Sequence, residues 1–235
     1  MATLEERKEL AAKKLEQCGQ THVLKYYDTL TEEEKDKLLT QIEQTDLSVT
    51  KYVHHREELS GRGEITPLKA LEISEIQKRE KEYHAIGLEQ IRAGKVAAVL
   101  LAGGMGTRLG SDNPKCMYDI GLTHPVYIMQ RLVENMMDVV HEAGRFFPFF
   151  IMTSDKNHDA TVSFMKEHSY FGYNPEMVFF FRQDMAPATD YDGKIYMENR
   201  FRMASSPNGN GGWFSSMNKA GLLDKLHELG VEWLN

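Results

Sequence analysis

Hydrophobic and polar positions in the first 94 residues follow a helical period. Apolar residues recur at steps of seven, four and three in a first run: Leu4, Ala11, Leu15 and Cys18. Thr3 and Glu6 have the spacing of a capping box at the start of this run, and Thr31 and Glu34 repeat that spacing before a second run. No strand pattern occurs in this region, so the sequence predicts a helical N-terminal arm over residues 1–94.

Glycine and proline residues punctuate the second half of this arm. Two glycines and a proline between Ser60 and Pro67 favour a loop. A further helical pattern begins at Ser74, and we expect Gly87 to interrupt it and Gly94 to close it.

From Val96 onward the pattern changes to short, continuous apolar runs that are typical of buried parallel strands. Three such runs are expected to be strands: Val96–Leu101, Phe149–Met152 and Val178–Phe181. Helical spacing separates and follows them: Tyr127–His141, the segment through Val162 and Met165, and a final helix around Leu222–Leu229. The pair Asp192-Gly193 favours a hairpin turn, and Val231–Leu234 is expected to start another strand. This alternation predicts an α/β fold, in which a partial, doubly wound, Rossmann-like sheet occupies residues 95–235 and binds ligands beyond the carboxyl ends of its strands.

Composition and charge exclude several classes of protein. Apolar residues make up 41% and charged residues 27% of the 235 residues, which is ordinary for a globular protein. The net charge of −7 disfavours a dedicated nucleic-acid-binding protein, because phosphate contacts need a clustered basic surface. Cys18 and Cys116 lack the spacing of a zinc site or a disulfide framework. No signal core and no run of about 18 apolar residues is present, so we expect a cytoplasmic protein with no membrane or nucleic-acid partner.

The glycine-rich loop after the first predicted strand carries the strongest chemical signal. Three glycines follow the strand, and Arg108 and Lys115 then place two cations within one loop, which suits a polyphosphate. A P-loop is excluded because no lysine follows the last glycine, and the dinucleotide fingerprint is excluded because Leu109 stands three positions after Gly106. A surface turn with two solvated cations is the structural alternative.

The loop LLAGGMGTRLGSDNPK resembles the signature of sugar-nucleotide pyrophosphorylases, and its extension PKCMYDIGL resembles the eukaryotic UDP-N-acetylhexosamine (UDP-N-acetylglucosamine) pyrophosphorylases. The similarity continues through further segments: Ile151–Ser154, Tyr170–Gly172, Phe180–Met185, Asp192–Ile195 and Pro207–Gly212. The resemblance implies a nucleotide-diphospho-sugar transferase fold. It also implies a uridylyltransferase that makes UDP-N-acetylglucosamine and pyrophosphate from UTP and N-acetylglucosamine 1-phosphate, which is an N-acetylhexosamine 1-phosphate.

The resemblance also implies a set of site residues. Arg108 would hold the triphosphate and the leaving pyrophosphate, and Lys115 would stabilise the α-phosphate. The residues implied to line the substrate pocket are Leu101, Ala102, Gly103, Gly104, Gln183, Gly209 and Asn210. Among them Gln183 matches a uracil-reading glutamine, whose amide offers both a donor and an acceptor to the base.

This sequence departs from the family pattern at several points. Cys116 stands where the family usually has glycine, and Asn208 replaces a usual aspartate. Mg²⁺ is the expected cofactor by resemblance, but the family's metal-binding Val-Asp-Asn segment is not found after Trp233, so its carboxylate ligand is expected beyond Asn235. We therefore predict a truncated form with little activity of its own and self-association through an unpaired sheet edge.

Other functions stay open at this point. The chain could be a UDP-glucose or broad UDP-sugar pyrophosphorylase, or a non-catalytic protein that binds uridine nucleotides. A helical interaction module with a vestigial sheet would bind no nucleotide at all.

Overall fold

The computed structural model describes residues 2–51, 53 and 63–235, and its contacts divide the chain into two compact units. The N-terminal unit comprises residues 1–68 and 185–207, and the sheet unit comprises residues 69–184 and 208–235. This division differs from the boundary expected after residue 94. Residues 185–207 contact the N-terminal helices, whereas the helices just before the first strand pack within the sheet unit.

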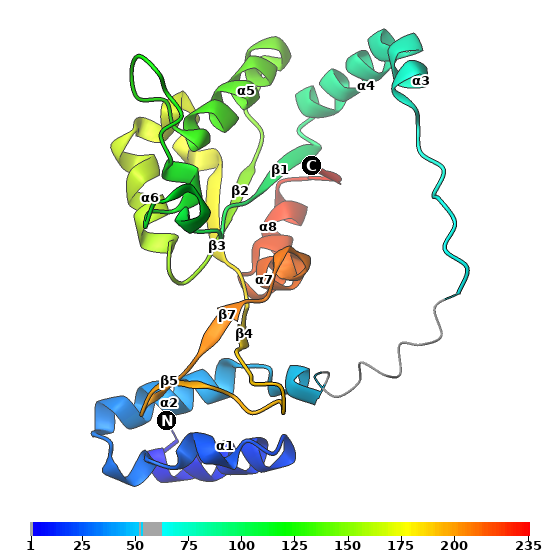
Figure 1. Cartoon of the computed structure of the whole chain (residues 1–235). Helices are drawn as coiled ribbons and strands as arrows, with labels where there is room; N and C mark the ends of the chain where they lie inside the picture. Colours follow the sequence, from blue (N-terminus) through cyan, green and yellow to red (C-terminus); the bar gives the residue numbers. More distant parts are fainter. Residues whose placement is uncertain (1, 52, 54–62) are drawn as a thin grey trace. The chain divides into compact units, whose positions relative to one another are not determined.

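The N-terminal unit pairs two helices with two small antiparallel ladders (Figure 1). Its helices are α1 (Leu4–Gln17) and α2 (Glu32–Gln44), with the 3₁₀ turns η1 (Thr21–Leu24) and η2 (Tyr27–Thr29) between them. Its ladders pair β4 (Met185–Pro187) with β7 (Ser205–Pro207), and β5 (Met197–Asn199) with β6 (Arg202–Met203). Complete capping boxes at Thr3 and Thr31 begin α1 and α2 as predicted.

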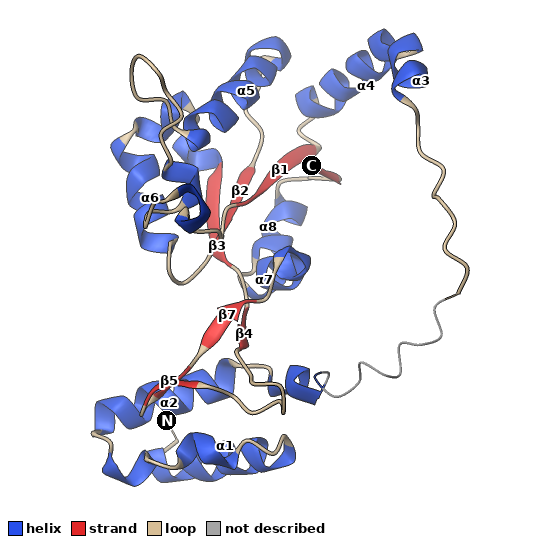
Figure 2. Cartoon of the chain, in the orientation of Figure 1, coloured by secondary structure: helices blue, strands red, loops and turns tan. Residues whose placement is uncertain are grey.

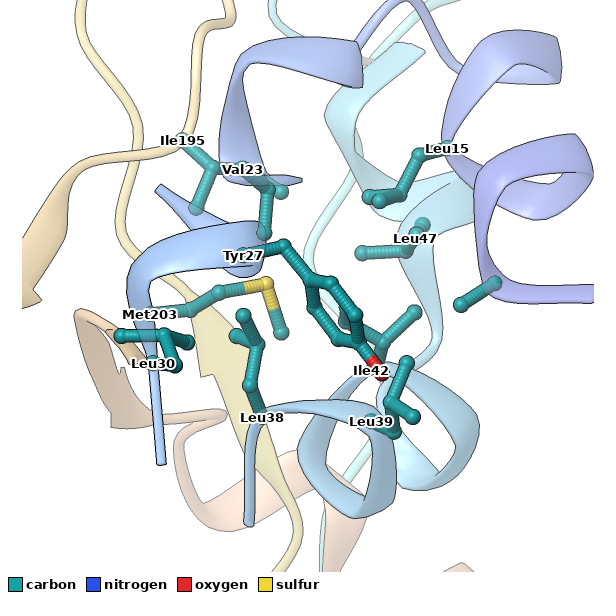
Figure 3. Packing of buried hydrophobic residues seen from close by; sticks show 11 residues of the cluster. Leu15, Val23, Tyr27, Leu30, Leu38, Leu39, Ile42, Leu47, Ile195 and Met203 are labelled. Carbon is teal, nitrogen blue, oxygen red and sulfur yellow. The ribbon is translucent and has the colours of Figure 1, made fainter. Parts of the chain in front are cut away.

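A hydrophobic core joins these two stretches of chain. Side chains from α1, α2 and the turns between them surround Tyr27 (Figure 3), and Ile195 and Met203 complete the cluster from the second stretch. Leu15, Leu38, Leu39 and Ile42 are fully buried in it. The segment 185–207 is therefore required to close the core of the N-terminal unit.

The second half of the predicted arm is only partly helical. Residues 60–62 of the predicted loop lie outside the described residues, and 63–67 have no regular secondary structure. Helices α3 (Ile73–Lys78) and α4 (Glu80–Arg92) follow. The helical pattern breaks at Arg79 rather than at Gly87, which lies inside α4 at an exposed position that tolerates glycine at a modest cost. Gly94, with φ of +78°, closes α4 as predicted.

The sheet unit is built on four parallel strands in the order β3-β2-β1-β8 (Figure 2). They are β1 (Val96–Leu101), β2 (Phe149–Thr153), β3 (Val178–Arg182) and β8 (Trp233–Leu234). The helices are α5 (Ile128–Ala143), α6 (His158–Glu167), α7 (Trp213–Lys219) and α8 (Leu222–Glu228). Short 3₁₀ turns connect them: η4 (Thr107–Leu109), η5 (Lys115–Met117), η6 (Ser169–Gly172), η7 (Pro175–Met177) and η8 (Asn210–Gly212).

The final helix predicted around Leu222–Leu229 is present as α8, and α7, which was not predicted, precedes it, with Gly221 in a left-handed conformation between the two. The strand expected from Val231 is present and pairs with β1. Among the residues described, no helix has the length and apolar character needed to cross a membrane.

Helices cover both faces of the sheet, which confirms the doubly wound prediction. On one face Val133 of α5 and Phe164 of α6 pack against Phe149 and Ile151. On the other face Met217 of α7 and Leu226 of α8 pack against Phe150, Met152 and Phe181. The order reverses at β1, since β2 lies on one side of it and β8 on the other. The loop after β1 therefore lies at the switch point where such sheets bind ligands.

Candidate functional site

The glycine-rich loop leaves β1 and folds back on itself. The Ala102 N–H donates to Met152 O at 2.8 Å and ties the start of the loop to β2. Further along, Gly106 N–H donates to Asn113 O at 2.8 Å, and Lys115 N–H donates to Gly104 O at 3.1 Å. The loop thus returns Lys115 to the side of Gly104, although the two residues are eleven positions apart in the sequence.

Three consecutive N–H groups of this loop are free. Those of Gly103, Gly104 and Met105 donate to no acceptor in the part of the chain that the structure describes. Successive free backbone N–H groups carry positive partial charges and form a cradle for an anion. Of the three glycines expected to direct N–H groups at a ligand, Gly103 and Gly104 have free N–H groups, whereas the Gly106 N–H donates to Asn113 O.

Two cations stand in the same loop. Arg108 lies in η4 and Lys115 begins η5, and both side chains are exposed. The ion pairs among described residues involve neither of them. Their charge is therefore available to a polyphosphate.

Gln183 lies directly after β3 and reaches the glycine loop. Its N–H donates to Thr153 O at 2.7 Å, which holds its backbone at the end of β2. The residue is only 6% exposed, but its carboxamide makes no hydrogen bond to the described residues and its polar atoms still reach solvent. A Cβ built on Gly103 would lie 2.5 Å from Gln183 Nε2, so the carboxamide rests against the glycine backbone. A mostly buried glutamine whose amide presents free donors and an acceptor to solvent is an expected feature of a site that reads a polar ring edge.

Asp184 connects this corner to the second glycine-rich segment. Its carbonyl accepts from Asn208 N–H at 3.1 Å, and its N–H donates to Ser216 Oγ at 2.9 Å. Gly209, with φ of +75°, and Asn210 follow at once and are exposed. The structure thus holds Gly209 and Asn210 near the end of β3, while no hydrogen bond of the described residues joins them to the loop after β1.

Sequence reasoning missed Asn157, which is fully buried between the loop and β2. Its Oδ1 accepts from Ser154 N–H at 2.7 Å. Its Nδ2 donates to Ala102 O at 2.9 Å and to Gly104 O at 3.3 Å. The available signal was an asparagine at a predicted strand-to-helix junction on the ligand-binding edge, a position where such residues often bond to nearby backbone.

Cys116 does not face the loop. It is buried, its Sγ lies 3.9 Å from Thr161 Oγ1, and burial raises the pKa of its thiol. The Cys116 side chain, which replaces the family's usual glycine, therefore packs in the hydrophobic core with residues of α5 and α6.

The described residues contain no ready-made cluster of metal-ligating side chains. They contain no group of three or more His, Cys, Asp or Glu side chains placed to hold a metal ion. Asp184, the carboxylate next to Gln183, accepts from Lys219 Nζ at 2.8 Å. Asp155 and Asp159 both face Arg182.

Fold and loop together define a doubly wound α/β protein with a parallel sheet, a run of free backbone N–H groups at its switch point and the amide of Gln183 beside them. A family profile described as "UTP--glucose-1-phosphate uridylyltransferase" matches residues 47–235, and the chain belongs to this family. The family relationship expected from the loop is thereby confirmed.

Individual relatives agree with this assignment. The chain is 35% identical to "UDP-N-acetylglucosamine diphosphorylase 2" of Arabidopsis thaliana, over 94% of this chain and 48% of that protein. It is 32% identical to "UDP-N-acetylglucosamine pyrophosphorylase" of Saccharomyces cerevisiae, over 92% of this chain and 49% of that protein. The chain spans about half the length of the curated relatives it matches.

Solved structures share the fold. The uridine diphosphate N-acetylglucosamine pyrophosphorylase of Trypanosoma brucei, in complex with inhibitor, matches with a TM-score of 0.79 and 27% identity. That match covers 100% of this chain and 52% of the other. A putative UDP-N-acetylglucosamine pyrophosphorylase from Entamoeba histolytica matches with a TM-score of 0.64 and 31% identity, covering 71% of this chain and 43% of the other.

Proposed function

We propose that this chain forms the nucleotide-binding part of a uridylyltransferase that makes UDP-N-acetylglucosamine and pyrophosphate from UTP and N-acetylglucosamine 1-phosphate. The observation that carries the proposal is the loop itself. Its N–H groups at 103–105 are free, its cations Arg108 and Lys115 pair with no described carboxylate, and the unpartnered amide of Gln183 rests against Gly103. The names of the relatives support the substrate class.

The reaction needs little covalent chemistry from the protein. A phosphate oxygen of the sugar 1-phosphate attacks the α-phosphorus of UTP in line. The bond from that phosphorus to the bridging oxygen breaks, and pyrophosphate leaves with the electron pair. Such transfer depends on positioning and on neutralising negative charge. In this proposal Lys115 stabilises charge on the α-phosphate, Arg108 holds the leaving pyrophosphate, and the free N–H groups bind phosphate oxygens.

The remaining pocket residues select the base and the sugar. Gln183 pairs through its amide with the uracil edge, which leaves it mismatched with cytosine. The backbones of Leu101 and Ala102 line the nucleotide pocket with the two glycines that follow, and Gly209 and Asn210 contact the uridine and the sugar. Mg²⁺ would neutralise part of the triphosphate charge, and no described residue is proposed as its ligand. Arg108 and Lys115 are the protein groups that neutralise phosphate charge in this proposal.

UTP binding tests the loop, with substitutions that remove one cation at a time. We expect Arg108→Ala and Lys115→Ala to weaken UTP binding roughly tenfold or more, because hydrogen bonds to charged groups are worth about 1.5–3 kcal/mol each. Lys166→Ala removes an exposed cation from α6 and serves as the matched control. Isothermal titration calorimetry measures all four proteins. Equal affinities for UTP across the set would contradict the assignment.

Turnover tests the reaction. Purified protein is given UTP and Mg²⁺ with N-acetylglucosamine 1-phosphate or glucose 1-phosphate, and pyrophosphate release is followed. Release that depends on N-acetylglucosamine 1-phosphate supports the proposal. Preference for glucose 1-phosphate would replace the substrate with UDP-glucose chemistry. UTP binding without release would make the protein a uridine-nucleotide-binding protein instead.

A further inference from the structure

The side chain of Asn157 is committed entirely to backbone groups at the carboxyl edge of the sheet. It begins α6, yet it makes no capping bond to that helix. Its Oδ1 accepts from Ser154 N–H, and its Nδ2 donates to the carbonyls of Ala102 and Gly104. The residue is 0% exposed, so these bonds form away from solvent. Helix capping therefore does not explain an asparagine at this position.

The two carbonyls that Asn157 holds fix the direction of two free N–H groups. A trans peptide unit is planar, and its C=O and N–H point in opposite directions. A bond from Asn157 to Ala102 O therefore turns the Gly103 N–H away from Asn157. By the same reasoning, the bond to Gly104 O, which also accepts from Lys115 N–H at 3.1 Å, helps to turn the Met105 N–H away. Both N–H groups belong to the run that donates to no acceptor among the described residues.

We infer that Asn157 is a positioning residue that presents the N–H groups of Gly103 and Met105 to the phosphates of the nucleotide. This inference rests on the proposed function, since it assumes that the loop binds phosphates. A glycine backbone readily changes conformation, because the absence of a Cβ makes many φ and ψ angles accessible. A fixed partner at the loop carbonyls keeps the donors aligned before the ligand arrives, which lowers the cost of ordering them on binding.

Two substitutions separate this role from simple support of the fold. Asn157→Asp keeps the volume and the acceptor for Ser154 N–H, but it removes both donors and places a carboxylate oxygen against two carbonyls. Asn157→Ala removes all three bonds without adding a charge, so an effect shared by both variants is not electrostatic repulsion of the ligand. Asn174→Asp is the matched control, because that side chain only accepts, from Glu176 N–H, and an aspartate can do the same.

The readout compares UTP with uridine, both titrated calorimetrically into the full chain. We expect both Asn157 variants to raise the Kd for UTP at least about tenfold, because two bonds to a charged ligand are misaligned. The Kd for uridine should change by less than about threefold, since Gln183 is untouched. Asn174→Asp should match the wild type with both ligands. Equal losses for UTP and uridine, or an unchanged Kd for UTP, would overturn the inference.

Hydrogen exchange without ligand provides an independent measurement. Both Asn157 variants should exchange faster than wild type over residues 101–117, while α7 and α8 exchange at unchanged rates. If the wild-type chain binds neither UTP nor uridine, the proposed function fails, whereas exchange still decides whether Asn157 orders the loop. Unchanged exchange over residues 101–117 would overturn the inference even if UTP binds well.

Discussion

Gly103 and Gln183 show how the absence of one Cβ places a binding side chain. The carboxamide of Gln183 occupies the space that a side chain at position 103 would fill. Neither residue alone signals this contact, because 80 positions separate them and the sequence gives only a glycine loop and a glutamine after a strand. The resemblance supplied both residues, while their mutual packing required the folded sheet.

Gly103→Ala tests this contact directly. The new Cβ should push the Gln183 amide from its place and weaken UTP binding, with little change in unfolding free energy because the amide is the flexible end of its side chain. The double variant Gly103→Ala/Gln183→Ala should bind UTP no more weakly than Gln183→Ala alone. Gly63→Ala, where a Cβ meets nothing within 4 Å, is the control. Additive losses in the double variant would show that position 103 acts by another route.

The protonation of His158, next to the end of β2, makes the stability of the folded state depend on pH. The Thr153 hydroxyl donates to Phe181 O, so it accepts from the Nδ1–H of His158 at 2.7 Å. Burial, and then the nearby Arg182 charge, lower the pKa of His158. The folded state therefore resists protonation, whereas the unfolded chain takes up a proton near the usual pKa of about 6.5.

This difference predicts that the histidine's contribution to stability is present above the unfolded pKa and is lost as pH falls below it. Between about pH 7.5 and pH 5.5, the wild type should lose more unfolding free energy than His158→Gln. Urea denaturation at each pH measures the difference, and His141→Gln on α5 serves as the control. Parallel pH profiles for wild type and His158→Gln would contradict the assignment.

At the scale of elements, two glutamines take the place of missing strand partners. Gln20 donates to Gly193 O at 2.7 Å and accepts from Ile195 N–H at 3.0 Å. Gln41 donates to Met203 O at 2.9 Å and accepts from Met203 N–H at 2.8 Å. Each amide thus satisfies one backbone donor and one backbone acceptor, around the turn at Gly193 for Gln20 and in β6 for Gln41, as a neighbouring strand would.

Gln41→Glu should destabilise the protein. A carboxylate can still accept from the Met203 N–H, but it cannot donate to the Met203 carbonyl and instead repels it. Leaving such a group unpaired costs about 1–3 kcal/mol. Gln44→Glu places the same change at an exposed position of α2 and should cost much less. Thermal unfolding measures both variants, and equal shifts in melting temperature would show that the amide pairing is not stabilising.

Elements whose signals are local could be predicted from the sequence, and those fixed by distant partners could not. The capping boxes at Thr3 and Thr31 and the apolar strands need only neighbouring residues. The roles of Gln20 and Gln41 depend on carbonyls 162 to 173 positions away. Asn157 is a similar case, because its partners lie in another loop.

For the whole molecule, the main difference from expectation is the path of residues 185–207. This segment leaves the sheet unit after β3, completes the N-terminal core and returns before α7. Its ends meet, because Asn208 N–H donates to Asp184 O and β4 pairs with β7. The hydrophobic periodicity of the sequence could not predict this division. Periodicity identifies single helices and strands, whereas a compact unit is defined by which helices and strands pack together.

The sheet unit should therefore fold without the N-terminal unit. We predict that a variant lacking residues 1–68, with 186–206 replaced by an Asn-Gly turn, unfolds cooperatively. It should also bind UTP within about threefold of the full chain, since every proposed site residue belongs to the sheet unit. Circular dichroism and calorimetry measure both properties. Loss of cooperative unfolding would show that the sheet needs the other unit.

The position of residues 185–207 late in the chain also delays completion of the N-terminal core during synthesis. Helices α1 and α2 are made first, but Ile195 and Met203, which close their core, are made only after β3. At about 5–20 residues per second, the ribosome needs on the order of ten seconds to cover that interval. Throughout it, Leu38, Leu39 and Ile42 lack the part of their hydrophobic surroundings that Ile195 and Met203 supply, so apolar surface of α2 stays exposed for that time.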